Sequence, residues 1–105
     1  MGGFAITTRN HDLNRSLLQC EAQRRSGNWA YASIDLNNYL ENNDGTFQLS
    51  GRNAWETSET SSWRLDGVTL SARLRRRNGA FNNASIDLNP YITNNDGTLQ
   101  WIVKS

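Results

Sequence analysis

The sequence predicts an all-β fold built from two similar halves, and three observations lead to this prediction. Residues 33–49 (SIDLNNYLENNDGTFQL) and 85–101 (SIDLNPYITNNDGTLQW) are identical at 12 of 17 positions, with an offset of 52. Apolar and polar residues alternate in several segments, as a strand with one buried face requires. Asn, Asp and Gly, which favour turns, separate these segments. At 105 residues the chain is one globular domain, in which the two repeats, about 1–51 and 53–105, share a core.

Each repeat contains a predicted β-hairpin. In the first repeat Leu18, Cys20 and Ala22 alternate with polar residues, and the turn at residues 25–28 precedes a second alternating segment at 32–36. The second repeat has the same pattern, with apolar positions Leu70, Ala72, Leu74, Ala84, Ile86 and Leu88 around a turn at 77–80. Two strands around a glycine-containing turn are typical of a hairpin. We expect Cys20, the only cysteine, to be a small buried residue, and one cysteine forms no intramolecular disulfide.

A short helical turn is predicted after each hairpin. Asn37 and Asn89 are expected to be its N-caps, and Pro90 suits a first helical position because its missing N–H needs no partner there. Tight turns follow at residues 43–46 and 95–98 (both NDGT), where Gly supplies the positive φ that other residues resist. Each tight turn leads into another segment with a period of two.

The remaining segments connect the repeats or begin them. Residues 50–53 (SGRN) are the predicted linker, and the polar residues 55–63 loosely mirror residues 4–11. The chain has no run of about 18 apolar residues, as a membrane-spanning helix needs. No basic segment followed by an apolar stretch marks a signal peptide. Together with the single cysteine, this leads us to expect an intracellular protein.

Patterns for catalysis are weak. His11 is the only histidine and has no histidine at the corresponding place in the second repeat, so we expect a solvated side chain and not half of a Ser-His pair. A glycosidase needs two facing carboxyl groups in distinct environments. The carboxylate pairs Asp35/Asp44 and Asp87/Asp96 lie in duplicated strands and turns, which suits a scaffold better. We therefore predict that the protein is not an enzyme.

The sequence does not match the ligand spacing or the ligand types of common metal-binding sites. An EF-hand loop that uses Asn42 and Asp44 would have Leu40 at its first position and Gly51 at its twelfth, and neither side chain can ligate calcium. One cysteine and one histidine do not complete a zinc site. The sequence predicts neither a metal nor a cofactor.

Arginines cluster at matching places beside the glycine-containing turns, at residues 24–25 and 75–77. Three interpretations remain open: solvated charge beside a turn, contacts to a phosphate backbone, and donors that orient hydroxyl groups in a small polar cleft. The net charge of +1 weakens the second. The third gains from Asn42, Asn43 and Asp44, because a site for sugar hydroxyls needs amides, a carboxylate and N–H donors.

The complete pattern closely resembles the cyanovirin-N homology family of lectins. The residues that carry the resemblance are Phe4, the two SIDLN segments, residues 41–46 (ENNDGT), Glu56–Thr57 and residues 94–101 (NNDGTLQW), and they span essentially the whole chain. The resemblance implies an elongated, pseudo-symmetric domain in which the repeats exchange strands. Lobe A would contain residues 1–38 and 91–105, and lobe B residues 39–90.

The resemblance also implies a lectin that binds high-mannose oligosaccharides, typically through terminal α1-2-linked mannose, without metal. Its partners would be mannose-containing oligosaccharides or glycoproteins, and not nucleic acid or membranes. The lobe B site maps onto Glu41, Asn42, Asp44, Asn53, Glu56, Thr57, Arg75, Arg76 and Arg77. The lobe A site maps onto Gly3, Thr7, Gln23, Arg25, Asn94, Asn95 and Asp96. Lobe B is the better candidate, because Gly3, Gln23 and Arg25 depart from the residue types of the family pattern.

One large departure concerns cysteines. The founding pattern has four cysteines in two disulfides, and their places are taken here by Thr8, Ala22, the Ser58 region and Leu74. Each missing disulfide forgoes up to about 2–4 kcal/mol. A member without disulfides or a visible signal peptide fits an intracellular, fungal-type branch, and we predict a monomer. The alternative function is a structural or protein-interaction module on the same fold with weak or no sugar binding.

Overall fold

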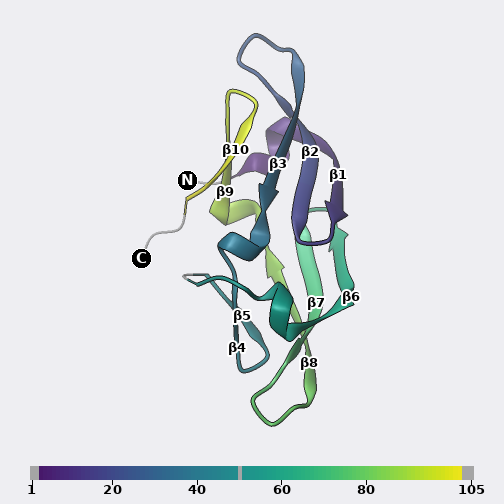
Figure 1. The fold of residues 1–105 in the computed structure, drawn as a ribbon. Coiled ribbons are helices and arrows are strands. Elements are labelled where there is room, and N and C mark those ends of the chain that lie inside the picture. Colours follow the sequence, from purple (N-terminus) through teal and green to yellow (C-terminus); the bar gives the residue numbers. More distant parts are fainter. Residues whose placement is uncertain (1–2, 50, 103–105) are drawn as a thin grey trace.

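The protein is an all-β molecule with short 3-10 helical turns, as the sequence predicts. The computed structural model describes residues 3–49 and 51–102; the predicted linker residue Ser50 and the ends of the predicted domain lie outside them. The molecule is elongated, with principal-axis extents of 50 × 28 × 16 Å (Figure 1). Within the described residues no helix has the length and apolar character needed to cross a membrane.

Fourteen elements follow one another in the described part of the chain, in two similar series. The first series is η1 (Phe4–Thr7), β1 (Thr8–Asn14), β2 (Leu17–Gln23), β3 (Trp29–Asp35), η2 (Leu36–Asn38), β4 (Glu41–Asn43) and β5 (Thr46–Gln48). The second series is η3 (Trp55–Thr57), β6 (Ser58–Asp66), β7 (Thr69–Arg75), β8 (Phe81–Asp87), η4 (Asn89–Tyr91), β9 (Ile92–Asn95) and β10 (Thr98–Trp101). They form two three-stranded antiparallel sheets, β1-β2-β3 and β6-β7-β8, and two hairpins, β4-β5 and β9-β10.

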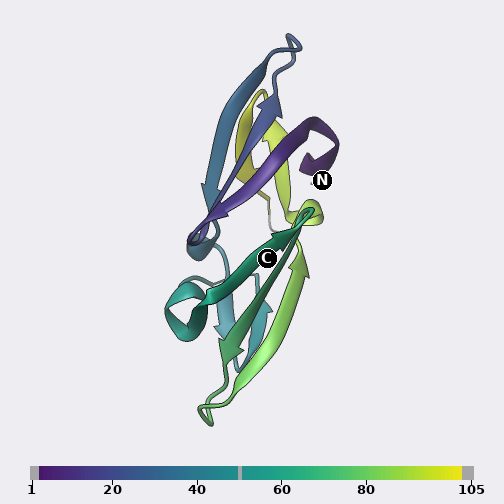
Figure 2. The ribbon, with the colours of Figure 1, turned by 90° about the vertical axis from the view of Figure 1, so that its right-hand side faces the viewer.

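Each hairpin packs against the sheet of the other series. Strand β10 contacts β3, and β9 contacts η1, whereas β5 contacts β8. Figure 2 shows the sheet β1-β2-β3 with hairpin β9-β10 at one end of the long axis, and the sheet β6-β7-β8 with hairpin β4-β5 at the other. Below, lobe A denotes η1, β1–β3 and β9–β10, and lobe B denotes β4–β5, η3 and β6–β8.

Strands β1 and β6 were not predicted from the sequence. Both are edge strands with few buried residues, and a bulge interrupts each of them. Across the bulge, the paired residues Arg9 and Asp12 are three positions apart in β1, and Glu59 and Arg64 are five positions apart in β6. The partner strand advances by two positions in each case. The second repeat therefore has two extra residues here, so structurally equivalent residues differ by 50 before the bulge and by 52 after it. Neither strand keeps a period of two through its bulge.

The predicted apolar faces form one core shared by both lobes. Leu18, Cys20 and Ala22 are buried, as are Leu70, Ala72 and Leu74 at the equivalent positions. Burial raises the pKa of the Cys20 thiol to about 11, and the neighbouring Glu21 carboxylate adds to the shift. Cys20 is thus a buried apolar residue, as predicted.

The prediction that Asn37 and Asn89 are N-caps is wrong. The Asp35 side chain caps η2 by accepting from the Asn37 backbone N–H, and Asp87 Oδ1 accepts from the N–H of Asn89 in the same way. The two asparagines lie inside the helical turns and leave their side chains free for other segments. Pro90 occupies the second position of η4, where no intrahelical donor is needed either.

The positions that correspond to the missing cysteines lie opposite each other in both lobes. Thr8 is paired with Ala22 across β1 and β2, and Ser58 is paired with Leu74 across β6 and β7. In each pair the first residue carries a hydroxyl group and the second is a fully buried apolar residue. The hydroxyl group makes a set of hydrogen bonds that we call the hydroxyl link.

The hydroxyl link of lobe A includes His11. Thr8 Oγ1 donates to the carbonyl of Phe4 (2.9 Å) and lies 2.7 Å from His11 Nε2. Because the hydroxyl proton points to the carbonyl, Nε2 is the donor in the second bond. The His11 ring also packs edge-on against Phe4, with centroids 5.7 Å apart. The prediction of a solvated His11 is therefore wrong, because the bulge in β1 turns the ring towards the core.

The hydroxyl link of lobe B has Trp63 in place of His11. Ser58 Oγ donates to the carbonyl of Trp55 (2.7 Å) and accepts from Trp63 Nε1 (2.7 Å). The Trp63 ring is buried and packs edge-on against Phe47 and Trp55. In both lobes one hydroxyl group thus ties the 3-10 turn to the bulge of the following strand.

We expect Ser58→Ala to lower the free energy of unfolding by about 1–3 kcal/mol, because the buried Trp63 Nε1–H loses its acceptor. Urea denaturation monitored by tryptophan fluorescence measures the change. Ser58→Thr introduces the hydroxyl residue found at Thr8 and should keep most of the stability. An alanine variant as stable as the parent protein would contradict a stabilising role of the link.

The stability of the protein should depend on pH through His11. Partial burial lowers the pKa of His11, so the unfolded chain binds more protons than the folded one as the pH falls below about 6.5. The contribution of the neutral His11 ring to the free energy of unfolding is fully present above the pKa of the unfolded state. It is lost as the pH falls through the lower pKa of the folded state. We expect His11→Gln to flatten the pH dependence of the unfolding free energy between about pH 7 and 5. Parallel curves for the two proteins would contradict the assignment.

Candidate functional site

One asparagine side chain joins three segments at the end of lobe B. Asn42 Nδ2 donates to Thr57 Oγ1 (2.9 Å), to the Thr57 carbonyl (3.2 Å) and to the Arg75 carbonyl (2.8 Å). Its Oδ1 accepts from the backbone N–H of Gly45 (2.8 Å). We call this arrangement the asparagine clamp. It connects strand β4, the end of η3, the end of β7 and the tight turn.

Lobe A has the same clamp. Asn94 Nδ2 donates to Thr7 Oγ1 (3.0 Å) and to the carbonyls of Thr7 (3.3 Å) and Gln23 (2.9 Å), and Oδ1 accepts from Gly97 N–H (2.8 Å). The two clamp asparagines, Asn42 and Asn94, are predicted site residues, and protein groups engage the amide of each. Their N–H groups are engaged in this arrangement, and these bonds position the segments around the site.

The tight turns at the hairpin tips require their residue types. In lobe B the two turn residues, Asp44 and Gly45, have φ of 51° and 92°. Positive φ at both positions is typical of the two-residue hairpin turn that matches strand twist. A Cβ on Gly45 would also lie 2.9 Å from Arg76 Cγ, so the turn packs directly on the arginine stem.

The tight turn and the arginine-bearing turn are held together by one carboxylate. Asp44 Oδ1 accepts from the backbone N–H of Arg77 (2.9 Å), and Arg77 Nη2 donates to Asn43 Oδ1 (3.3 Å). In lobe A, Arg25 makes the same bonds to Asp96 (2.9 Å) and Asn95 (3.1 Å). In both lobes the Asn-Asp-Gly turn is thus hydrogen-bonded to the turn that carries the arginines, which agrees with the third interpretation of the arginine clusters.

These segments surround a groove of about 410 Å³ at the end of lobe B. It is lined by Asn42, Asp44, Thr57, Arg75, Arg76, Arg77 and Gly79. Among the described residues the ion pairs are Arg9–Glu21 and Arg73–Glu59, so none of the guanidinium groups of residues 75–77 forms an ion pair with a carboxylate. We call this the lobe B tip groove. It presents several N–H donors, one hydroxyl group and one carboxylate.

Three predicted lobe B residues lie outside the groove. The exposed Glu41 side chain abuts Gly51, and Asn53 donates its backbone N–H to the Asn37 carbonyl (2.8 Å). Glu56 Oε2 accepts from Asn37 Nδ2 (3.3 Å) on the other side of η3, where it lines a different groove.

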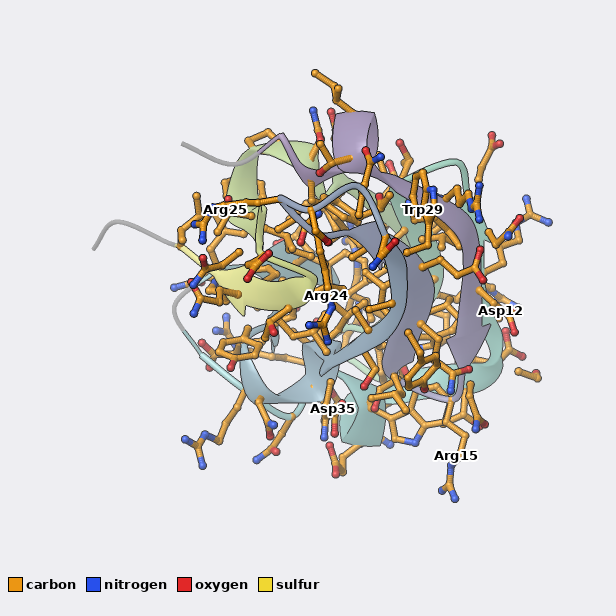
Figure 3. All side chains as sticks on the ribbon, turned by 90° about the horizontal axis from the view of Figure 1, so that it is seen from above. Asp12, Arg15, Arg24, Arg25, Trp29 and Asp35 are labelled. Atoms are coloured by element: carbon orange, nitrogen blue, oxygen red, sulfur yellow. The ribbon has the colours of Figure 1, made fainter. Side chains whose placement is uncertain are left out.

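The predicted lobe A residues divide in the same way. Six of them lie at or beside the clamp and are joined by hydrogen bonds from side chains or backbone: Thr7, Gln23, Arg25, Asn94, Asn95 and Asp96. Gly3 lies at the other end of η1, where its N–H donates to the Asn89 carbonyl (2.6 Å). Figure 3, seen down the long axis from this end, shows Arg25 near the β9–β10 hairpin.

Sequence reasoning missed Gly79 and Asn82. Gly79 lines the tip groove, and Asn82 Nδ2 donates to the Gly45 carbonyl (2.9 Å). The residue equivalent to Asn82 in lobe A is Ala30, which cannot make this bond. A comparison of the two repeats position by position shows this difference, but nothing in the sequence links residue 82 to the tight turn 37 residues away.

Comparison with known proteins gives a consistent family. A sequence model of the CVNH domain matches residues 4–100. A cyanovirin-N homolog from Neurospora crassa is 35% identical over 92 residues, which is 83% of each chain. A designed cyanovirin-N homolog lectin has 34% identity and a TM-score of 0.86, covering 94% of this chain and 98% of that one. Microvirin, solved as a complex with mannobiose, has 26% identity and a TM-score of 0.83, covering 96% and 99%.

We expect Asn42→Ala to lower the free energy of unfolding by about 2–4 kcal/mol, because it removes four hydrogen bonds that join distant segments. Asn94→Ala should have a similar effect through the lobe A clamp. Asn43→Ala removes one long bond at an exposed position and serves as the control. Equal stability of the Asn42 and Asn43 variants in urea denaturation would show that the clamp is not a structural centre.

Proposed function

The chain belongs to the CVNH domain family, and on this premise we propose that it is a carbohydrate-binding lectin, not an enzyme, that recognises high-mannose oligosaccharides through terminal α1-2-linked mannose. The observation that carries the proposal is the lobe B tip groove, which combines the arginines 75–77, the Thr57 hydroxyl and the Asp44 carboxylate. Sugar hydroxyls donate and accept hydrogen bonds, and this set offers partners for both.

The side chains of the groove have separable roles. Asp44 uses one oxygen to hold the Arg77 backbone, and its other oxygen makes no hydrogen bond among the described residues, so it is available to a hydroxyl donor. Arg75 and Arg77 supply donors that suit a pair of neighbouring hydroxyls. The Asn42 clamp fixes Thr57 and the end of β7 before the ligand arrives, which reduces the ordering cost of binding. No metal is needed in this scheme.

The two ends are proposed to bind with unequal strength. Lobe A has Gln23 at the place of Arg75 and therefore offers fewer charged donors. Arg25 and Asp96 keep the geometry of Arg77 and Asp44. The complex of microvirin with mannobiose supports the choice of sugar. Two sites at the ends of one rigid body would also link branches of a glycan and raise avidity.

The proposal is tested by an NMR titration of the ¹⁵N-labelled protein with α1-2-mannobiose. We expect shifts at Asp44, Thr57 and Arg77, and Arg77→Ala should weaken this binding about tenfold or more because a charged donor is lost. Arg25→Ala, the matched change at the other end, should leave lobe B affinity unchanged.

Salt separates the sugar from a phosphate-bearing partner. Affinity for neutral mannobiose should change little between 50 and 500 mM NaCl, whereas binding through arginine–phosphate contacts falls steeply with salt. The absence of any shift at millimolar mannobiose would overturn the lectin proposal.

A further inference from the structure

A second groove lies at the waist of the molecule, where the β1–β2 turn of lobe A faces η3 of lobe B. Its volume is about 420 Å³, and the residues that matter are Asn14, Arg15, Asp35, Asn37, Trp55 and Glu56. We propose that this waist groove is a further saccharide site, which takes one neutral hexose unit against the Trp55 ring. The inference rests on the proposed function, because it assumes a glycan ligand.

Arg15 occupies a backbone conformation that favours glycine. It is the first residue of the two-residue loop between β1 and β2, and its φ is 58°. The equivalent loop in lobe B has Gly67 at this place, with φ of 62°. A long side chain in the left-handed region is strained, and such strain clusters at ligand sites. In Figure 3 Arg15 projects outward from the ribbon, on the same side of the molecule as Asp35.

The loop that carries Arg15 is firmly held. Ser16 Oγ donates to Asp35 Oδ1 (2.7 Å), and the Ser16 carbonyl accepts from the Leu36 N–H (2.9 Å). Arg15 makes no ion pair with a carboxylate in the described part of the chain. The strained residue is therefore fixed by its neighbours, while its guanidinium remains available to a ligand.

The Trp55 ring is the apolar surface of the groove. The ring is half-buried and is backed by Trp63, whose centroid lies 5.2 Å away. The Arg15 guanidinium carbon lies 5.9 Å from the Trp55 centroid, beyond the van der Waals contact that Arg9 makes with Trp29 at 3.9 Å. The guanidinium therefore lies over the ring at the outer limit of a cation–π contact, and because the Arg15 side chain is exposed, a flat sugar face that displaces it gives up only this one weak contact.

Polar groups surround the ring in a fixed arrangement. Asn37 Oδ1 accepts from the Trp55 backbone N–H (2.9 Å), and Asn37 Nδ2 donates to Glu56 Oε2 (3.3 Å). Glu56 and Asp35 each keep one oxygen that makes no hydrogen bond within the described residues. With one arginine and two carboxylates the formal charge is 1 − 2 = −1, which disfavours an anionic sugar and favours a neutral one.

The fold does not impose this set of residues. At the pseudo-equivalent place on the other side, Ala5 replaces Trp55, Ile6 replaces Glu56, Gly67 replaces Arg15 and Val68 replaces Ser16. Ile6 is 88% exposed there. Asp66 and Asp87, which correspond to Asn14 and Asp35, keep carboxylates at that place, so only the waist groove combines an aromatic ring and a guanidinium with carboxylates.

The test uses the NMR titration with α1-2-mannobiose and reads the waist separately, through the indole Nε1–H signal of Trp55 (assigned with Trp55→Phe) and the amide signals of Arg15 and Asn37. We expect these signals to shift. Arg15→Gly should weaken binding at the waist about tenfold, while the thermal midpoint stays equal or rises because glycine relieves the strain. A residue with only a structural role would not give binding loss together with unchanged or higher stability.

Gly67→Arg is the matched control. It creates the strain at the equivalent loop without a tryptophan, so it should lower the thermal midpoint and create no new binding. Shifts confined to Thr57 and Arg77 would overturn the waist site and leave the proposed function standing. No shifts at either place would overturn both, and full retention of waist binding in Arg15→Gly would also overturn the inference.

Discussion

The asparagine clamp is the constraint on which both ends of the molecule depend. In lobe B a single amide group, that of Asn42, satisfies acceptors on Thr57 and Arg75 and fixes the N–H of Gly45. These residues are as many as 33 positions apart in the chain. A short hairpin of three-residue strands has little stability of its own. The clamp, together with the Asp44–Arg77 bond, docks this hairpin onto the neighbouring sheet and so creates the tip groove.

Duplication preserved this polar framework but allowed the cores to diverge. Lobe A fills the space beside its 3-10 turn with Phe4 and His11, whereas lobe B uses Ala54 and Trp63 at the equivalent places. A large residue and a medium one are exchanged for a small residue and a very large one, which keeps both interiors filled. In each case the aromatic N–H bonds the hydroxyl group at the place of a missing cysteine. The two ends therefore share a geometry and differ in surface chemistry.

Much of the architecture was readable from the sequence, because the signals are local. The period of two in β2, β3, β7 and β8 and the Asn-Asp-Gly turns follow from which side chains a strand buries and from the backbone freedom of glycine. The sequence left the role of the arginine clusters open among three interpretations, because nothing local shows which segment the arginines face. Strands β1 and β6 escaped prediction, since they are largely polar edge strands and a bulge in each breaks the alternation.

Local sequence patterns are enough to define the repeat, most of the strand segments, the tight turns and the family. Which polar side chains line the grooves depends on packing, because each amide or carboxylate bonds the partner that packing places within reach. The Asn42 amide bonds protein groups in the clamp, Asp35 caps η2, and Glu56 accepts from Asn37 at the waist groove. The waist groove itself joins Arg15 of one repeat to Trp55 of the other, and no local pattern relates two such residues. Their proximity exists only because the lobes pack on a common core.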